Sequence, residues 1–139
     1  MKNAVLLLAL LAAVSAAGAS RKPAVAPANS TSAVHGCSAC REKRPVVDPS
    51  RLDKADKSAR PAYEAAKKHP ATIDAIHCYC GCEQNPGLHH VSLLTCFTNE
   101  HAIGCEICRK EAVLAGRMKD EGSTDEETRE VVESLYRTR

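Results

Sequence analysis

The sequence predicts an all-α protein, a small helical bundle with a cysteine-rich loop, preceded by a signal peptide and a disordered tether. Three observations lead to this class. The chain opens with an apolar run that ends in small side chains, continues with a polar, proline-rich stretch, and then repeats apolar side chains at helical spacing. The boundaries that we expect are residues 1–19 for the signal peptide, 20–61 for a flexible linker and 62–139 for the helical domain.

The first 19 residues have the three parts of a signal peptide. Residues 1–3 are a short basic start, residues 4–14 form an unbroken apolar run, and residues 17–19 match the A-x-A pattern of a cleavage site. Removing these 19 of the 139 residues leaves 120, so we expect an extracytoplasmic protein, periplasmic or secreted, that begins near Ser20. The first cysteine is Cys37, which lies too far from the apolar run to suggest a lipid anchor.

The charge and the hydropathy argue against two classes of partner. The formal net charge is +2, and it falls to +1 once Lys2 is removed with the signal peptide. A charge this small gives no broad positive field for nucleic acid. After the signal peptide, no apolar run approaches the roughly 20 residues that a spanning helix needs. We therefore expect no nucleic-acid partner and no integral membrane span.

The linker and the helical domain differ in apolar content. Residues 20–61 contain five prolines and five large apolar residues, too few to offset the entropy cost of ordering the segment. Residues 62–139 contain eighteen large apolar residues, but the whole chain has one Phe and no Trp. A domain of this size with so few aromatic residues usually needs disulfides or a metal to be firmly stable.

The first two helices are expected on either side of Pro70. Residues 60–69 are rich in good helix formers, carry a proline near the first turn, and end where Pro70 follows. A second short turn is expected over residues 71–76. Residues 77–90 contain the Gly, Pro and Asn residues typical of a loop.

Three helical segments are expected after this loop. Ser92 is placed to cap a short helix, residues 105–120 form a longer one that ends at Gly122, and residues 123–126 read as a capping box for the last helix. The apolar positions of these helices are, in order, Leu93, Leu94 and Phe97; Ile103, Ile107, Leu114 and Met118; and Val131, Val132 and Leu135.

Six of the eight cysteines and four of the six histidines lie within residues 77–108. Cys78, Cys80 and Cys82 occupy every second position, and a disulfide across one intervening residue is strained. Either each thiol pairs with a distant cysteine, or the loop curls at Gly81 until several thiolates converge on one ion. The distant cysteines are Cys96, Cys105 and Cys108.

Cys105 and Cys108 form a C-x-x-C at the start of a predicted helix, where the helix dipole lowers a thiol pKa. This spacing suits half of a tetrahedral thiolate site, a redox pair or a structural disulfide. A c-type haem site is excluded because no C-x-x-C is followed by His, and iron–sulfur spacings and common hydrolase motifs are missing. The nitrogen donors that we consider with the thiols are His77, His90 and His101.

Residues 77–82, 90–97 and 105–108, with His101 between the last two, resemble the exported bacterial PCYCGC-motif (lipo)protein family. The similarity runs from about Tyr63 to Tyr136. It implies an extracytoplasmic cysteine-rich domain, for which metal handling is a common interpretation, with the six cysteines of residues 78–108 as its signature. This chain departs from the family pattern at His77, where the motif usually has Pro, and in lacking an anchor cysteine after the signal.

We interpret the chain as an exported metal-binding protein rather than an enzyme, with copper as the first choice of ion and zinc as the second. A protein that donates or accepts the metal is the partner that this function suggests. The alternatives are a disulfide-stapled structural or interaction domain without metal and a thiol–disulfide oxidoreductase that cycles Cys105 and Cys108. Cys37 and Cys40 suit either a local disulfide or an auxiliary metal site. The candidate ligands are Cys78, Cys80, Cys82, Cys96, Cys105, Cys108, His77, His90 and His101.

Overall fold

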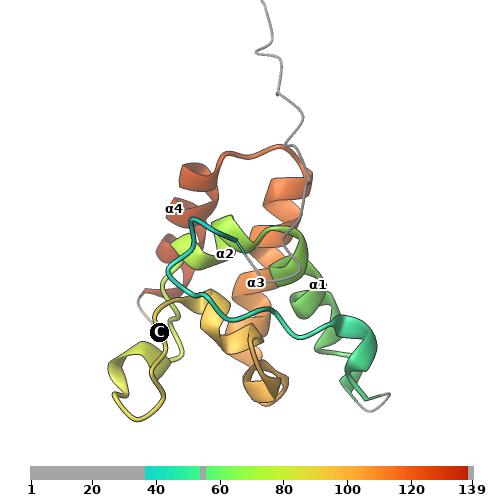
Figure 1. Cartoon of the computed structure of the whole chain (residues 1–139). Helices are drawn as coiled ribbons and strands as arrows, with labels where there is room; N and C mark the ends of the chain where they lie inside the picture. The colour runs from blue at the N-terminus through green and yellow to red at the C-terminus, as the bar shows by residue number, and fades with distance from the viewer. Residues whose placement is uncertain (1–36, 54–55, 138–139) are drawn as a thin grey trace, which may run out of the picture.

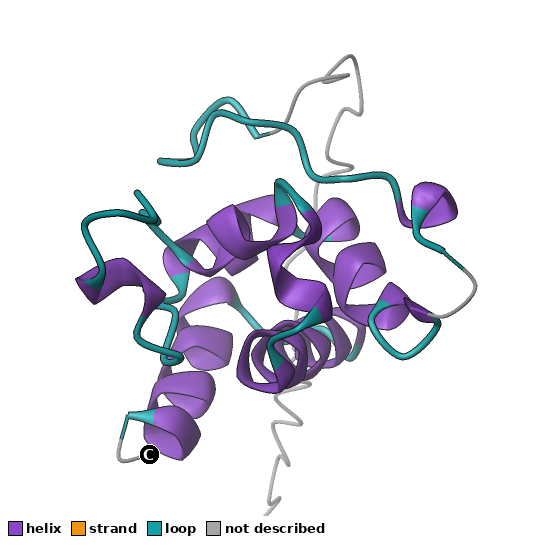
Figure 2. Cartoon of the chain, turned by 90° about the horizontal axis from the view of Figure 1, so that it is seen from below, coloured by secondary structure: helices purple, strands orange, loops and turns teal. Residues whose placement is uncertain are grey.

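The computed structural model describes residues 37–53 and 56–137. Within these ranges the chain forms helices and loops without a strand, which confirms the all-α prediction (Figure 2). The predicted signal peptide and residues 20–36 of the expected linker lie outside the described residues. The α-helices are α1 (Arg60–Lys68), α2 (Pro70–Ala75), α3 (Glu106–Asp120) and α4 (Asp125–Tyr136), and the short 3-10 helices are η1 (Pro49–Arg51), η3 (Cys82–Gln84), η4 (Leu93–Phe97) and η5 (Glu100–Ile103).

Helices α1 and α3 pack closely because their facing side chains are small. The buried face of α3 carries Ala112, Ala115 and Gly116, and a Cβ atom at Gly116 would lie 2.6 Å from the Cβ atom of Ala65 on α1. No larger side chain fits at this crossing. The large apolar residues that we expected to form the buried face of α3, such as Leu114 and Met118, are only half-buried and lie at its margins.

The centre of the core joins α1 to η4. The rings of Tyr63 and Phe97 pack edge to face with centroids 5.1 Å apart, and the Tyr63 hydroxyl donates a hydrogen bond to the carbonyl oxygen of Asn99 at 2.8 Å. Ile73 from α2 and Leu93 from η4 are fully buried beside them. This packing fixes η4, which carries Cys96, against the helices.

Residues 37–53, which we call the strap, precede the predicted domain boundary at residue 62 and pack against the helices. Figure 1 shows the strap running across the helices to η1, which contacts α1. The Asp74 carboxylate accepts hydrogen bonds from the backbone N–H groups of Arg41 at 2.6 Å and Glu42 at 3.1 Å, and Val47 N–H donates to the carbonyl oxygen of Phe97 at 2.9 Å. The strap is ordered by these polar contacts, which its low apolar content did not indicate.

Two local predictions need correction. Ser92 stands at the N-cap position of η4, but its hydroxyl donates to the buried Asp74 carboxylate at 2.7 Å instead of capping the helix. The capping box of α4 begins one residue later than expected, with Thr124 and Glu127 as its reciprocal partners.

The buried face of α4 also differs from the predicted one. It consists of Thr128, Val132 and Tyr136, because residues four apart share one side of a helix. Val131 and Leu135, which we expected in the core, are 38% and 52% exposed.

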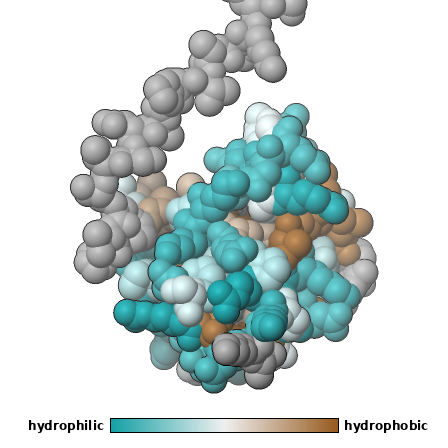
Figure 3. All heavy atoms as spheres, turned by 90° about the vertical axis from the view of Figure 1, so that its right-hand side faces the viewer, coloured by the Kyte–Doolittle hydropathy of each residue, from teal (hydrophilic) through white to brown (hydrophobic). Residues whose placement is uncertain are grey.

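Among the described residues, no helix is long and apolar enough to cross a bilayer. Polar side chains cover most of the face in Figure 3, and apolar surface is confined to small patches.

Candidate metal centre

The loop after α2 curls as the sequence predicted. Gly81 has a φ of 86°, a left-handed conformation that a residue with a Cβ atom adopts only with strain. The turn brings the Cys80 sulfur within 3.1 Å of the Cys78 sulfur and within 2.8 Å of the Cys82 sulfur. Three thiols from one short loop therefore lie side by side.

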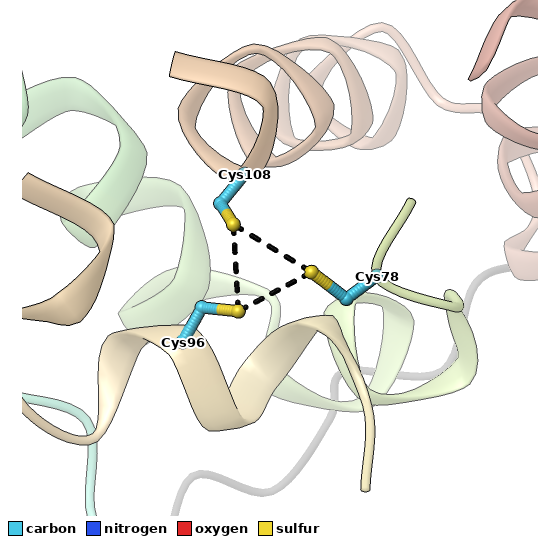
Figure 4. Close-up of side chains that lie close together, drawn as sticks. All are labelled: Cys78, Cys96 and Cys108. Carbon is cyan, nitrogen blue, oxygen red and sulfur yellow. Dashed lines mark hydrogen bonds between the residues drawn. The ribbon is translucent and has the colours of Figure 1, made fainter. Parts of the chain in front are cut away.

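Three cysteines from different segments meet at the base of this loop. Cys78 comes from the loop, Cys96 from η4 and Cys108 from the first turn of α3, and their side chains point toward one another (Figure 4). Their sulfur atoms lie 3.4 to 3.6 Å apart, and all three residues have no exposed surface. The helical core closes around this trio.

The remaining thiols and two imidazoles extend the trio toward the surface. The Cys105 sulfur lies 3.1 Å from the Cys108 sulfur, the Cys82 sulfur lies 3.2 Å from His101 Nε2, and the Cys96 sulfur lies 3.4 Å from His90 Nδ1. The two imidazole rings pack edge to face with centroids 4.8 Å apart. The donor atoms fall into four mutually adjacent groups, namely Cys78, Cys96 and Cys108; Cys78, Cys80 and Cys82; Cys80, Cys105 and Cys108; and Cys82, His90 and His101.

The structure therefore brings together all of the predicted ligands except His77. His77 Nδ1 lies 2.7 Å from a carboxylate oxygen of Glu83, and its Nε2 lies 3.0 Å from the side-chain nitrogen of Gln84. The same Glu83 carboxylate accepts the backbone N–H of Cys78 at 2.7 Å. His77 thus supports the shape of the loop and does not present a nitrogen to the sulfur atoms.

The six clustered cysteines are free thiols. The sulfur separations of 2.8 to 3.6 Å among them exceed the roughly 2.05 Å of a disulfide bond. Cys37 and Cys40, at the start of the strap, form a disulfide with each other. The local disulfide considered for this pair is confirmed, and the pair is separate from the donor groups.

Neighbouring thiols shift the pKa values of the buried cysteines in opposite directions. Hydrogen bonds from the thiols of Cys108 and Cys96 hold the pKa of Cys78 far below the ordinary thiol value. The pKa of Cys108 is raised, first by its hydrogen-bonding contact with the Cys78 sulfur, then by that with the Cys96 sulfur and by desolvation. The expected lowering of a thiol pKa by the α3 dipole is therefore not found at Cys108, where the neighbouring sulfurs dominate.

The surroundings of the buried His90 imidazole favour its neutral form. Desolvation, together with the nearby His101 ring, lowers the pKa of His90. A lower pKa favours the neutral imidazole, which is the form that coordinates metal ions.

Glu111 is part of the site that sequence reasoning missed. It is fully buried on α3, and its carboxylate accepts the backbone N–H of Tyr79 at 3.2 Å, so that it ties the cysteine loop to the helix. Burial, and after it the negative charge of Cys78, raises the pKa of Glu111 to about 8. Its position one helical turn after Cys108 is the sequence signal that could have identified it.

These donors can hold a metal ion. Thiolate sulfur with some imidazole nitrogen is the donor set that copper(I) and zinc prefer, and here the fold brings these donors together from separate segments. A mobile set of ligands would have to lose conformational freedom on binding, whereas a set already held by the core loses little.

Comparisons with known proteins identify the family of the chain. No curated protein and no solved structure matches the chain significantly. The model of one family, described as proteins of unknown function with a PCYCGC motif, matches residues 5–139. The chain therefore belongs to the PCYCGC-motif family, and the six signature cysteines of that resemblance are the ones gathered in the candidate metal centre.

Proposed function

We propose that this protein is an exported carrier of a soft metal ion, copper(I) first and zinc second, and that the cysteine cluster is its binding site. The observation that carries the proposal is the convergence of six free thiols and two imidazoles within one connected group. Buried thiols without a covalent or metal partner contribute little to stability beyond that of small apolar groups. A ligand that binds to all of these side chains would explain why they lie at one point.

The grouping of the donors favours copper(I) over zinc. Among the described residues, each mutually adjacent group holds three donors rather than four. Copper(I) is well satisfied by two or three thiolates, whereas a structural zinc site is a closed tetrahedron of four ligands.

The position of the outer donors supports a carrier rather than a purely structural site. Cys80, Cys105 and His101 are half-buried, in contrast to the fully buried Cys78 and Cys108. Partly accessible thiolates allow a donor or acceptor protein to exchange ligands with the bound ion. The signal-peptide pattern of residues 1–19 supports an extracytoplasmic location for this exchange.

A thiol–disulfide oxidoreductase remains the second candidate. Cys105 and Cys108 have the C-x-x-C spacing, and their sulfur atoms lie 3.1 Å apart. The raised pKa of Cys108 and its complete burial disfavour it as an attacking thiolate. A dithiol reductase activity abolished by Cys105→Ser alone would favour this candidate over the carrier.

Anaerobic metal competition tests the proposal. Reduced mature protein would be titrated with copper(I) or with zinc in the presence of a chelator of known affinity. We expect tight binding of copper(I), little loss of it in a variant in which Cys37 and Cys40 are both replaced by Ser, and severe loss in Cys108→Ser. Binding that is no tighter than that of the Cys108→Ser variant, for both metals, contradicts the proposal.

A further inference from the structure

We propose that the centre holds several copper(I) ions at once, about four, in a cluster whose ions are bridged by cysteine sulfur. This inference rests on the proposed function and adds the number of ions and the role of each ligand. It follows from the way in which the four donor groups share their members.

The donor groups form one connected network. Cys78 belongs both to the fully buried group and to the group of the loop, and Cys108 joins the buried group to the one that contains Cys105. Cys80 and Cys82 are shared in the same way, each between two groups. Ions placed in neighbouring groups would therefore have to use the same sulfur atom.

Every donor that is shared is a sulfur atom. Cys96, Cys105, His90 and His101 each belong to a single group, so both imidazoles are terminal donors. This division matches the chemistry of the atoms, because a thiolate sulfur has several lone pairs and can bridge two ions, whereas an imidazole nitrogen has one and binds a single ion. Each of the four groups contains three donors, which makes twelve ligand positions in total. Eight residues fill these positions, because four of the cysteines belong to two groups each. Four three-coordinate ions would use each position once.

Burial and charge also favour several ions over one. A single ion in the innermost group would leave Cys80, Cys82 and Cys105 without a metal partner next to it. Deprotonating these thiols without nearby cations would place several like charges together in a largely buried region, which is costly. Several monovalent ions compensate that charge within the cluster itself.

The expected result is a copper content of about four ions per chain, reached cooperatively. Because the first ion displaces the protons of the sulfurs that it shares and holds these sulfurs in place for the next ion, native mass spectrometry at limiting copper(I) should show mainly metal-free and fully loaded chains. Copper X-ray absorption of the loaded protein should contain scattering from a second copper atom.

Matched cysteine variants separate bridging from simple ligation. Cys78 and Cys96 are both fully buried, but Cys78 is shared by two groups and Cys96 belongs to one. Cys80 and Cys105 form a second pair, half-buried, with the same difference. We expect Cys78→Ser and Cys80→Ser to lose about two ions and Cys96→Ser and Cys105→Ser to lose about one. If the Cys78→Ser and Cys96→Ser variants fail to fold, the comparison of Cys80→Ser with Cys105→Ser alone tests whether the shared sulfurs bridge two ions.

The outcomes distinguish this inference from the function on which it rests. If each chain binds one copper ion tightly and the X-ray absorption shows no copper–copper scattering, the proposed cluster is wrong and the proposed carrier function is unaffected. Equal losses within both pairs also overturn the bridging roles. Absence of binding to copper(I) and to zinc overturns the proposed function and the cluster together.

Discussion

Replacing Glu42 by Gln should destabilise the reduced, metal-free protein by about 2 kcal/mol at pH 7. Glu42 lies on the strap with only 4% of its surface exposed. Its carboxylate accepts hydrogen bonds from the Arg44 guanidinium at 2.8 and 2.9 Å and from the Thr95 hydroxyl at 2.7 Å. Thr95 precedes Cys96 on η4, so this carboxylate ties the strap to the segment that carries a cluster sulfur.

The magnitude follows from the pKa of the carboxyl. The hydrogen bonds from Arg44, opposed by desolvation, lower the pKa of Glu42 from 4.5 to about 2. A lowering of this size corresponds to roughly 3 kcal/mol of stability. The Arg44 side chain is 52% exposed, and screening by water reduces the contribution to about 2 kcal/mol.

The sign of the pH dependence is fixed by the direction of the shift. Because the pKa in the folded protein lies below that of the unfolded chain, the contribution is complete above pH 4.5 and is lost as the pH falls toward 2. Urea unfolding of the parent protein and of Glu42→Gln, between pH 7 and pH 2, measures it. The free energies of unfolding should differ by about 2 kcal/mol at pH 7 and converge in acid. The exposed Glu64→Gln should change little at either pH. A constant difference over the whole pH range would refute the role assigned to the Glu42 charge.

Three further changes test the packing, the last helix and the placement of the site. Gly116→Ala places a Cβ atom against α1 and should lower the free energy of unfolding by about 1–3 kcal/mol in urea titrations; an unchanged value would show that α1 and α3 can separate without cost. Thr124→Ala removes the N-cap of α4 and should lower the free energy of unfolding by about 1 kcal/mol, whereas Ser123→Ala should lower it much less. A larger effect of Ser123→Ala would instead support the capping register expected from the sequence. Cys80→Ser should lower the bound copper measured by elemental analysis far more than Cys37→Ser, and equal effects would mean that the metal site is placed wrongly.

The helices were predictable because their signals are local. Pro70 separates α1 from α2, and Gly122, with a φ of 95°, ends the run of α3. The convergence of the cysteines could also be anticipated, since the spacing of Cys78, Cys80 and Cys82 disfavours local disulfides and Gly81 permits the curl. These are properties of short segments, independent of the rest of the fold.

The strap and the supporting carboxylates depend on contacts between distant residues. The strap is held by hydrogen bonds of its own Glu42 and of Asp74 on α2, and its low apolar content gave no sign of these polar contacts. His77 was expected to be available as a nitrogen donor, but Glu83 and Gln84 occupy both of its ring nitrogens. The spacing of Glu111 from Cys108 places the two residues on one side of α3, but the burial of its carboxylate follows only from the packing of that helix.

The most direct test of the metal centre is a combined thiol count and elemental analysis of the mature protein, purified without oxygen from cells supplied with copper. We expect six thiols that become titratable once metal is removed, with several copper ions per chain in the native protein and one disulfide, Cys37–Cys40. Three additional disulfides among the clustered cysteines, with no bound metal, would contradict this expectation.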